Sequence, residues 1–312
     1  MLRSLLFFRK QNPTKSGSEN CSIESNIFPV VNPAIDGLDC NQDCADCTIK
    51  YPSRFKINTD RELYGSIKPF VKHVLVATGK ADWAEKVENE QGSVMEGFKN
   101  GSFKPRTGPM MVSASNMSID PERKNVAGQE NATTVLVLPS FTFVDSVTVS
   151  KIPEFMDRFI DSPEAEVHHL SMTDAETNSQ TPHPQQLTTR PCLRDHIILL
   201  CSHNRRDARC GISAPLIRRE LERHLRHLCL YRDEDDTRPG GVSIIFVSHV
   251  GGHKFAANVL IYRRKEEQMI WLARVAPKDC EGIVKYTVLQ GKVVHPEQLR
   301  GGFDQLVGRE VR

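Results

Sequence analysis

The hydrophobic pattern of the chain is clearest in residues 195–262, where two apolar, β-branched runs flank an amphipathic segment. The runs DHIILLC (195–201) and GVSIIFV (241–247) have the composition of buried parallel strands. The segment between them is predicted to be a helix that starts at Ser213-Ala214-Pro215 and repeats apolar residues on one face, at Ile217, Leu221, Leu225 and Leu228. A right-handed βαβ unit of this kind places the C-terminal ends of its two strands side by side.

A hairpin and a second helix complete this C-terminal region. Residues 258–262 and 269–275 are predicted as strands joined by a charged turn, and residues 279–289 as a helix. Gly301-Gly302 then leads into a short tail. Strand, helix, strand, hairpin and helix follow one another in the order of the thioredoxin fold. We therefore predict a thioredoxin-like domain over residues 193–312.

A weaker pattern of the same kind lies between residues 55 and 161. It predicts strands and helices in a similar order, with strands at 73–79, 109–113, 133–138 and 141–144 and helices at 81–98 and 152–160. We interpret this region as a degenerate thioredoxin-like module without ligands. Residues 162–192 are polar, proline-punctuated and without periodicity, which predicts a linker. The predicted fold class is α/β, with two thioredoxin-like modules.

Four potential metal ligands follow the two apolar runs of the βαβ unit. Cys201 and Cys210 follow the first run, and His249 and His253 follow the second. Because the two strand ends lie together, the two thiols and two imidazoles are expected to converge. Gly251-Gly252 allows the histidine loop to fold tightly. Two thiolates and two imidazoles suit a [2Fe–2S] cluster and also satisfy tetrahedral zinc.

The segments CSHNRRDARCG and SHVGGHKFAANV resemble the ligand loops of the sucrase/ferredoxin-like family, relatives of the thioredoxin-like [2Fe–2S] ferredoxins. The resemblance extends over about residues 55–312. It implies that residues 193–312 form a thioredoxin-like ferredoxin domain whose [2Fe–2S] cofactor is bound by Cys201, Cys210, His249 and His253. It also implies single-electron transfer or redox control with a redox partner protein, rather than an enzyme with its own substrate pocket. In this pattern His203 lies near the cluster without being a ligand.

Three further cysteines, Cys40, Cys44 and Cys47, lie among four aspartates in residues 36–47. This segment can be a mobile acidic loop with free thiols, or Cys44 and Cys47 can form a redox pair. Neighbouring carboxylates should raise the pKa of these thiols, which disfavours an activated nucleophile. A zinc site here would need further ligands, such as Cys21 or a distant histidine. Thiol oxidoreductase activity in protein thiol quality control and a structural zinc module therefore stay as alternative functions.

Composition narrows the class of protein further. Hydrophobic residues make up 39% and charged residues 26% of the chain, and the formal net charge is only +2. Such a balance gives no support for nucleic-acid binding, and no apolar run approaches the roughly 20 residues that span a bilayer. Nine cysteines, an odd number with uneven spacing, do not suggest a secreted disulfide framework.

The N-terminus has the composition of a mitochondrial targeting segment. Residues 1–18 contain four basic residues and no acidic residue. We therefore expect a transit peptide, a soluble mitochondrial protein and, because free thiols suit a reducing compartment, the matrix rather than the intermembrane space. Residues 1–54 are interpreted as this targeting segment followed by the cysteine-rich acidic region.

Overall fold

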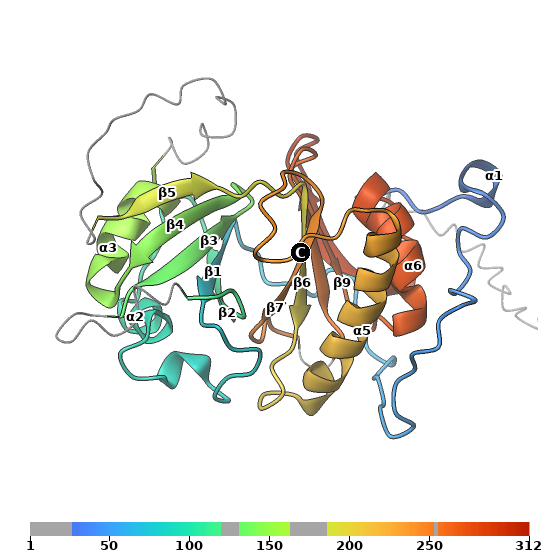
Figure 1. The fold of residues 1–312 in the computed structure, drawn as a ribbon, viewed down its shortest axis with the longest axis horizontal. Coiled ribbons are helices and arrows are strands. Elements are labelled where there is room, and N and C mark those ends of the chain that lie inside the picture. The colour runs from blue at the N-terminus through green and yellow to red at the C-terminus, as the bar shows by residue number, and fades with distance from the viewer. Residues whose placement is uncertain (1–26, 120–130, 163–185, 253–254, 312) are drawn as a thin grey trace, which may run out of the picture.

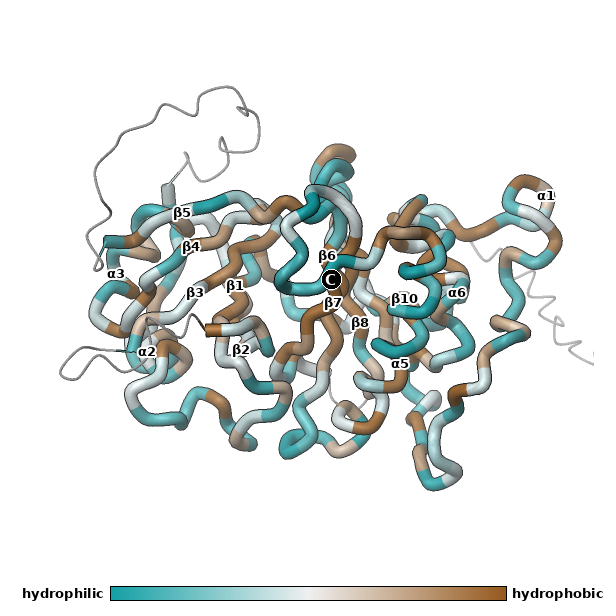
Figure 2. The backbone as a smooth tube through the Cα atoms, viewed as in Figure 1, coloured by the Kyte–Doolittle hydropathy of each residue, from teal (hydrophilic) through white to brown (hydrophobic). Residues whose placement is uncertain are grey.

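The computed structural model describes residues 27–119, 131–162, 186–252 and 255–311, and these ranges form a mixed α/β structure around one large sheet (Figure 1). Eleven strands pair in the spatial order β11-β10-β9-β8-β6-β7-β2-β1-β3-β4-β5. In that order their bounds are Arg309–Val311, Leu299–Asp304, Gln268–Leu272, Val259–Arg263, His196–Cys201, Val242–Val247, Met110–Ser115, Lys72–Ala77, Thr133–Leu138, Thr142–Val147 and Thr188–Pro191. Figure 2 shows hydrophobic residues concentrated on the central strands.

The two halves of the sheet have the same strand order and the same strand directions. In the C-terminal half, β6 is parallel to β7 and antiparallel to β8, which pairs with β9. In the N-terminal half, β1 is parallel to β2 and antiparallel to β3, which pairs with β4. The halves meet at a short antiparallel junction between β2 and β7, at Ser115 and Val247. The predicted strands of both regions are confirmed within a few residues.

The two halves also pack against each other through side chains. One buried cluster contains residues of both halves, among them Leu75, Leu136, Leu199 and Leu260. At its centre the His73 ring on β1 lies 3.0 Å from the Tyr262 hydroxyl on β8 and 3.0 Å from the Ser113 hydroxyl on β2. Burial lowers the pKa of His73 to about 3, so this ring is neutral at pH 7. Each half also has a buried cluster of its own between its helices and the sheet.

The helices are shorter and more broken than the periodicity predicts, except α5. They are α1 (Pro33–Asp36), η1 (Val87–Asn89), α2 (Val94–Asn100), η3 (Val149–Lys151), α3 (Ile152–Phe155), η4 (Met156–Ile160), α5 (Ala208–His227), η6 (Pro277–Asp279), α6 (Cys280–Gly282), η7 (Ile283–Val288) and η8 (Pro296–Gln298). Helices α5 and α6 lie side by side over the C-terminal half (Figure 1). The predicted helices at 152–160 and 279–289 are confirmed, although each changes from α to π geometry along its length.

The single helix predicted for residues 81–98 is wrong. Residues 81–86 are not helical and η1 is a single 3₁₀ turn; Gly92 then has a φ of +71°, and Ser93 caps α2 by accepting a hydrogen bond from the Glu96 amide at 3.1 Å. The Glu96 carboxylate in turn accepts from the Gly92 amide at 2.8 Å. These two hydrogen bonds resemble a capping box, except that the carboxylate accepts from the residue before the N-cap, and they fix the start of α2.

Two other boundaries differ from the sequence prediction. Helix α5 begins at Ala208 rather than at Ser213, because the Asp207 carboxylate caps it by accepting from the Arg209 amide at 3.0 Å. The predicted tail after Gly301 is instead part of β10, followed by β11. A Cβ on Gly302 would collide with the Met269 carbonyl, so glycine is needed for β10 to approach β9 closely. The sequence did not predict this strand, because glycine has a low strand propensity.

Candidate metal centre

The two cysteines of the βαβ unit meet at the C-terminal end of β6. Cys201 is the last residue of β6, and Cys210 lies in the first turn of α5 rather than in the predicted loop. Both are buried, and their thiols share a hydrogen bond. The pKa of Cys201 is well below its ordinary value, first because the Cys210 thiol can donate to its thiolate. The pKa of Cys210 is raised, because its ionisation would place a second negative charge beside the first.

His249 joins these two thiols from the neighbouring strand. It follows β7 directly, and its ring makes a side-chain hydrogen bond with Cys201 that further lowers the pKa of that thiol. Three of the four predicted ligands are thus brought together, as expected from adjacent parallel strand ends. The fourth, His253, lies outside the described residues.

The loop after His249 turns through two glycines. Gly251 has a φ of +87° and Gly252 a φ of +64°, a region that favours glycine. A Cβ on Gly252 would also collide with the guanidinium of Arg300. The predicted tight turn at these glycines is confirmed, and Gly252 has a second, packing reason that the sequence did not show.

His203 holds the histidine loop in place without being available as a ligand. Its Nε2–H donates to the Ala84 carbonyl at 2.9 Å, and its Nδ1 accepts from the His249 backbone amide at 3.2 Å. Because a carbonyl only accepts and an amide only donates, the tautomer of His203 is fixed. Both ring nitrogens are used, which agrees with the supporting role predicted for this residue.

Arg300 is a functional candidate that the sequence reasoning missed. Its guanidinium is buried, lies 4.5 Å from the Trp271 ring centroid, and donates to the Gly251 carbonyl and to the Asn258 side chain, each at 3.1 Å. Burial lowers the pKa of Arg300 to about 10, while the Cys201 charge opposes that shift, so Arg300 stays cationic at pH 7. No prediction covered it, because Arg300 lies in β10, between the predicted helix at 279–289 and the predicted tail.

These side chains form a buried donor set that suits a soft or borderline metal centre. In the described part of the chain, Cys201 interacts both with the Cys210 thiol and with the His249 ring, and it ionises more readily than an ordinary thiol. Thiolate and imidazole are the ligand types of iron–sulfur and zinc sites. The residues present therefore fit the predicted cluster as far as three of its four ligands.

A family model described as "Sucrase/ferredoxin-like" matches residues 63–301. The chain belongs to the sucrase/ferredoxin-like family. "Actin patches distal protein 1" of Saccharomyces cerevisiae is 31% identical over 268 residues, which cover 80% of this chain and 79% of that protein. "Altered inheritance of mitochondria protein 32" of Clavispora lusitaniae is 28% identical over 263 residues, 80% of this chain and 88% of that protein. No solved structure showed significant similarity.

The arginines that crowd the cysteine loop of this family member are largely paired with carboxylates. Arg209 lies 2.8 Å from Asp207. Arg205 and Arg206 each lie 3.7 Å from a carboxylate of the segment after β1, that of Asp82 and that of Glu85 respectively. These contacts connect the cysteine loop to the N-terminal half.

The cysteine-rich segment packs against the outer side of α5 and α6 (Figure 1). Cys44 is buried and Cys47 half-buried, and both are free thiols. Burial is the main cause that raises the pKa of both thiols, and nearby Glu281 and Glu220 add to it. A raised pKa disfavours the redox-pair interpretation, because the thiolate is the attacking species.

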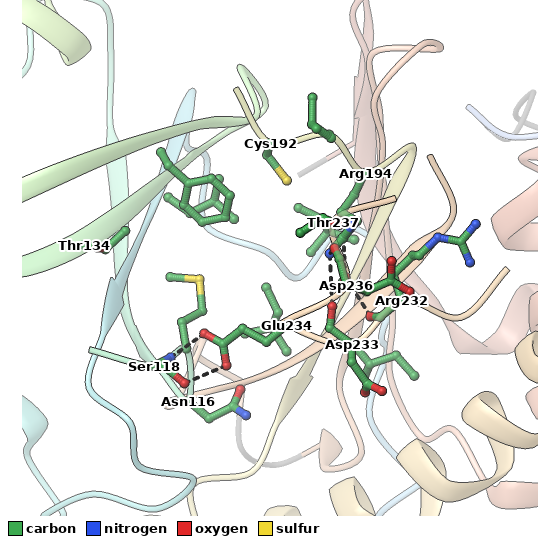
Figure 3. A pocket seen from close by; sticks show the side chains of 18 of the residues that line it. Asn116, Ser118, Thr134, Cys192, Arg194, Arg232, Asp233, Glu234, Asp236 and Thr237 are labelled. Carbon is green, nitrogen blue, oxygen red and sulfur yellow. Dashed lines mark hydrogen bonds between the residues drawn. The ribbon is translucent and has the colours of Figure 1, made fainter. Parts of the chain in front are cut away.

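A cavity of about 490 Å³ is lined by residues of both halves, among them Ser118 after β2 and Arg194 before β6 (Figure 3). None of the predicted ligands lines it. Glu234 accepts a hydrogen bond from the Ser118 hydroxyl at 2.9 Å across its rim, and the Arg194 guanidinium donates to backbone carbonyls, including that of Asp233 at 3.0 Å. The polar groups of this cavity are thus largely used within the protein.

Within the described ranges, every helix is too short or too polar to cross a bilayer.

Proposed function

We propose that this chain is a [2Fe–2S] protein that acts in single-electron transfer or redox control, with Cys201, Cys210, His249 and His253 as cluster ligands. The observation that carries the proposal is the buried contact of Cys201 with both Cys210 and His249 at the ends of two parallel strands. Membership of a ferredoxin-like family supports it. The cluster would supply one-electron chemistry, with thiolates on one iron and imidazoles on the other.

The chain's own residues would bind, orient and shield that centre. Cys201 and Cys210 are shielded from water, and the easily ionised thiol of the pair provides the first thiolate. His203 fixes the backbone at His249, and Arg300 fixes the next turn through Gly251. Residues that surround metal ligands commonly hold the ligand side chains in a fixed orientation in this way.

The repeated strand order supports the finer fold proposal. Both halves show a parallel pair, then two antiparallel steps, and each has a helix between its parallel strands and another after its hairpin. We infer two thioredoxin-like modules, at 55–161 and 193–312, of which the second is the ferredoxin-like one. Residues 162–192 would connect them, although residues 188–191 of this segment form β5.

We further infer a mitochondrial location, with the matrix favoured over the intermembrane space. The acid-free basic composition of residues 1–18 and the name of the relative from Clavispora lusitaniae support it. The physiological partner would be a redox protein that exchanges single electrons with the cluster.

Metal analysis of the full-length protein tests the proposed function. Protein purified without oxygen should contain two irons and two sulfides per chain, absorb visible light and give a paramagnetic signal when reduced. Cys201→Ser should abolish all three, whereas Cys229→Ser, at an exposed cysteine, should change none. Iron-free protein whose zinc disappears with Cys201→Ser would overturn the proposal in favour of a zinc site.

A further inference from the structure

A second group of metal donors lies where the cysteine-rich segment meets α5 and α6. Donor atoms of Cys44, His224 and Glu281 all lie within 4.8 Å of one another. They come from the extended segment, from the last turn of α5 and from α6, respectively, so they are distant in the sequence. Neither cysteine of the proposed cluster belongs to this group.

The backbone holds this group together without any ion. The Cys44 amide donates to the Lys278 carbonyl at 2.9 Å, and the Lys278 ammonium lies 2.7 Å from the Asp43 carboxylate. Farther along, the Tyr286 hydroxyl donates to the Asp36 carbonyl at 3.1 Å. On the other side of Cys44, the Tyr51 hydroxyl donates to the Val275 carbonyl at 2.6 Å, so the segment is held both before and after the thiol that faces α5.

The acceptors of the group converge on one point, which a guanidinium nitrogen occupies. Arg223 Nη2 lies 3.5 Å from Cys44 Sγ, 3.0 Å from His224 Nε2 and 2.8 Å from Glu220 Oε2. A guanidinium can only donate, so His224 Nε2 must carry a lone pair directed at the same point as the thiol. A thiol, an imidazole and a carboxylate directed at one cation are a metal-type donor set, and the Glu281 carboxylate lies within 4.8 Å of the same thiol and imidazole.

Cys47 can supply a second thiolate. It follows Cys44 at the C-x2-C spacing of zinc knuckles. It is half-buried, and its thiol donates to the Ile49 carbonyl at 3.4 Å. Cys47 is not one of the donors within 4.8 Å of one another, so it would join them by a turn of its side chain that gives up this weak thiol hydrogen bond.

We propose that Cys44, Cys47, His224 and Glu281 bind a divalent zinc ion that fastens the cysteine-rich segment to the α5–α6 surface. Two thiolates, one imidazole and one carboxylate complete a tetrahedral set. Binding releases the two thiol protons to solvent and displaces the Arg223 guanidinium, whose side chain is 34% exposed and can turn outward. The ion's positive charge takes the place of the guanidinium beside Glu220.

The test measures zinc and iron separately in the full-length protein and in variants at each site. Wild-type protein should bind a single zinc in addition to the cluster iron. Cys44→Ser and His224→Gln should lose zinc and keep iron, whereas Cys201→Ser should keep zinc and lose iron. The matched controls are the exposed residues Cys229 and His227, and Cys229→Ser and His227→Gln should keep both metals.

Two further measurements separate metal binding from a purely structural role of these side chains. Cobalt added to zinc-free protein should give the thiolate charge-transfer and tetrahedral d–d bands, and these should vanish in His224→Gln. Arg223→Met should bind zinc about tenfold tighter, because an internal cation no longer occupies the site. A structural network would instead gain no affinity from that change.

Defined outcomes overturn the inference. The inference is wrong if the wild-type protein binds no zinc at equimolar metal. It is also wrong if zinc is lost with Cys201→Ser but kept with Cys44→Ser. A disulfide between Cys44 and Cys47 in protein purified without oxygen would likewise contradict it. If Cys44→Ser does not fold, Glu281→Gln serves instead, since Glu281 is exposed. It should weaken zinc binding at least about tenfold. Iron and sulfide contents report on the proposed function independently of all these results.

Discussion

The two halves of the sheet share a strand order, yet the proposed metal ligands lie at the strand ends of the C-terminal half. In the C-terminal half, β6 ends at Cys201, and α5 brings Cys210 back beside it. At the matching position after β1, the Thr78 hydroxyl donates to the Ser115 carbonyl at 2.7 Å and accepts from the Trp83 indole at 2.8 Å. The same strand arrangement thus closes its own loop in one half and brings the proposed ligands together in the other. Chemistry follows from the residues at the strand ends, not from the fold.

The half without ligands is nevertheless part of the metal centre. Its segment after β1 supplies backbone carbonyls to the residues that follow Cys201. The Ser202 hydroxyl donates to the Ala81 carbonyl at 2.6 Å, and His203 donates to the Ala84 carbonyl. One half therefore supplies donors for a metal, and the other supplies acceptors that orient them.

The largest expected effect comes from breaking this link. His203→Phe keeps the ring volume but removes the hydrogen bonds to Ala84 and to the His249 amide. Since residues that orient metal ligands contribute about 10–100-fold in affinity, we expect the cluster to be lost to a chelator about 10–100-fold faster. The decay of visible absorption measures this rate.

The control for that experiment is His196→Gln, because His196 lies at the opposite end of β6. It should leave the rate of cluster loss unchanged. Equal rates for His203→Phe and wild-type protein would show that the N-terminal half does not support the metal centre.

Two glycines, one in each half, are expected to show an effect of intermediate size when replaced. Gly79 and Gly252 follow strands of different halves and have φ values of +65° and +64°. Alanine at either position should cost about 1 kcal/mol in unfolding free energy, because both require the left-handed region. At Gly252 the added Cβ also collides with Arg300, so Gly252→Ala should be more destabilising. It should also reduce iron content, which Gly79→Ala should not.

Urea unfolding and iron analysis measure the two effects. If Gly79→Ala and Gly252→Ala were equally destabilising and both retained iron, the contact between the histidine loop and Arg300 would have no role in the metal centre.

The sequence predicted the features that local patterns determine. The alternating and continuous apolar runs located the strands, and adjacent parallel strand ends brought Cys201, Cys210 and His249 together. It could not predict contacts between distant segments. Arg300 reaches the centre only because β10 adds to the sheet, and His224 approaches Cys44 only because the cysteine-rich segment folds back over α5.

Helix boundaries failed for a different physical reason. Pro215 favoured a helix start at Ser213, but the Asp207 cap nucleates α5 earlier and the helix tolerates the internal proline. The consequence is functional, because the earlier start places Cys210 on a rigid helix instead of a loop. In the N-terminal half, the α-helix of the predicted 81–98 range starts only at Val94, after the positive φ of Gly92 and the Ser93 cap.

The smallest expected effect concerns the interface of the two halves and acid. His73 has a pKa of about 3 when folded and about 6.5 when unfolded, because burial disfavours its charged form. The unfolded chain therefore binds the proton more readily, so the stability that neutral His73 contributes is present above pH 6.5 and is lost as pH falls toward 3. Between pH 7 and pH 5.5 we expect the free energy of unfolding to fall by roughly 1 kcal/mol, and His73→Gln should remove this pH dependence.

Trp83 and Trp271 lie in different halves, so variants that keep one tryptophan report on each half. Because His73 contacts Tyr262 across the interface, both reporters should shift together with pH; a shift confined to the Trp83 reporter would show that the halves unfold independently.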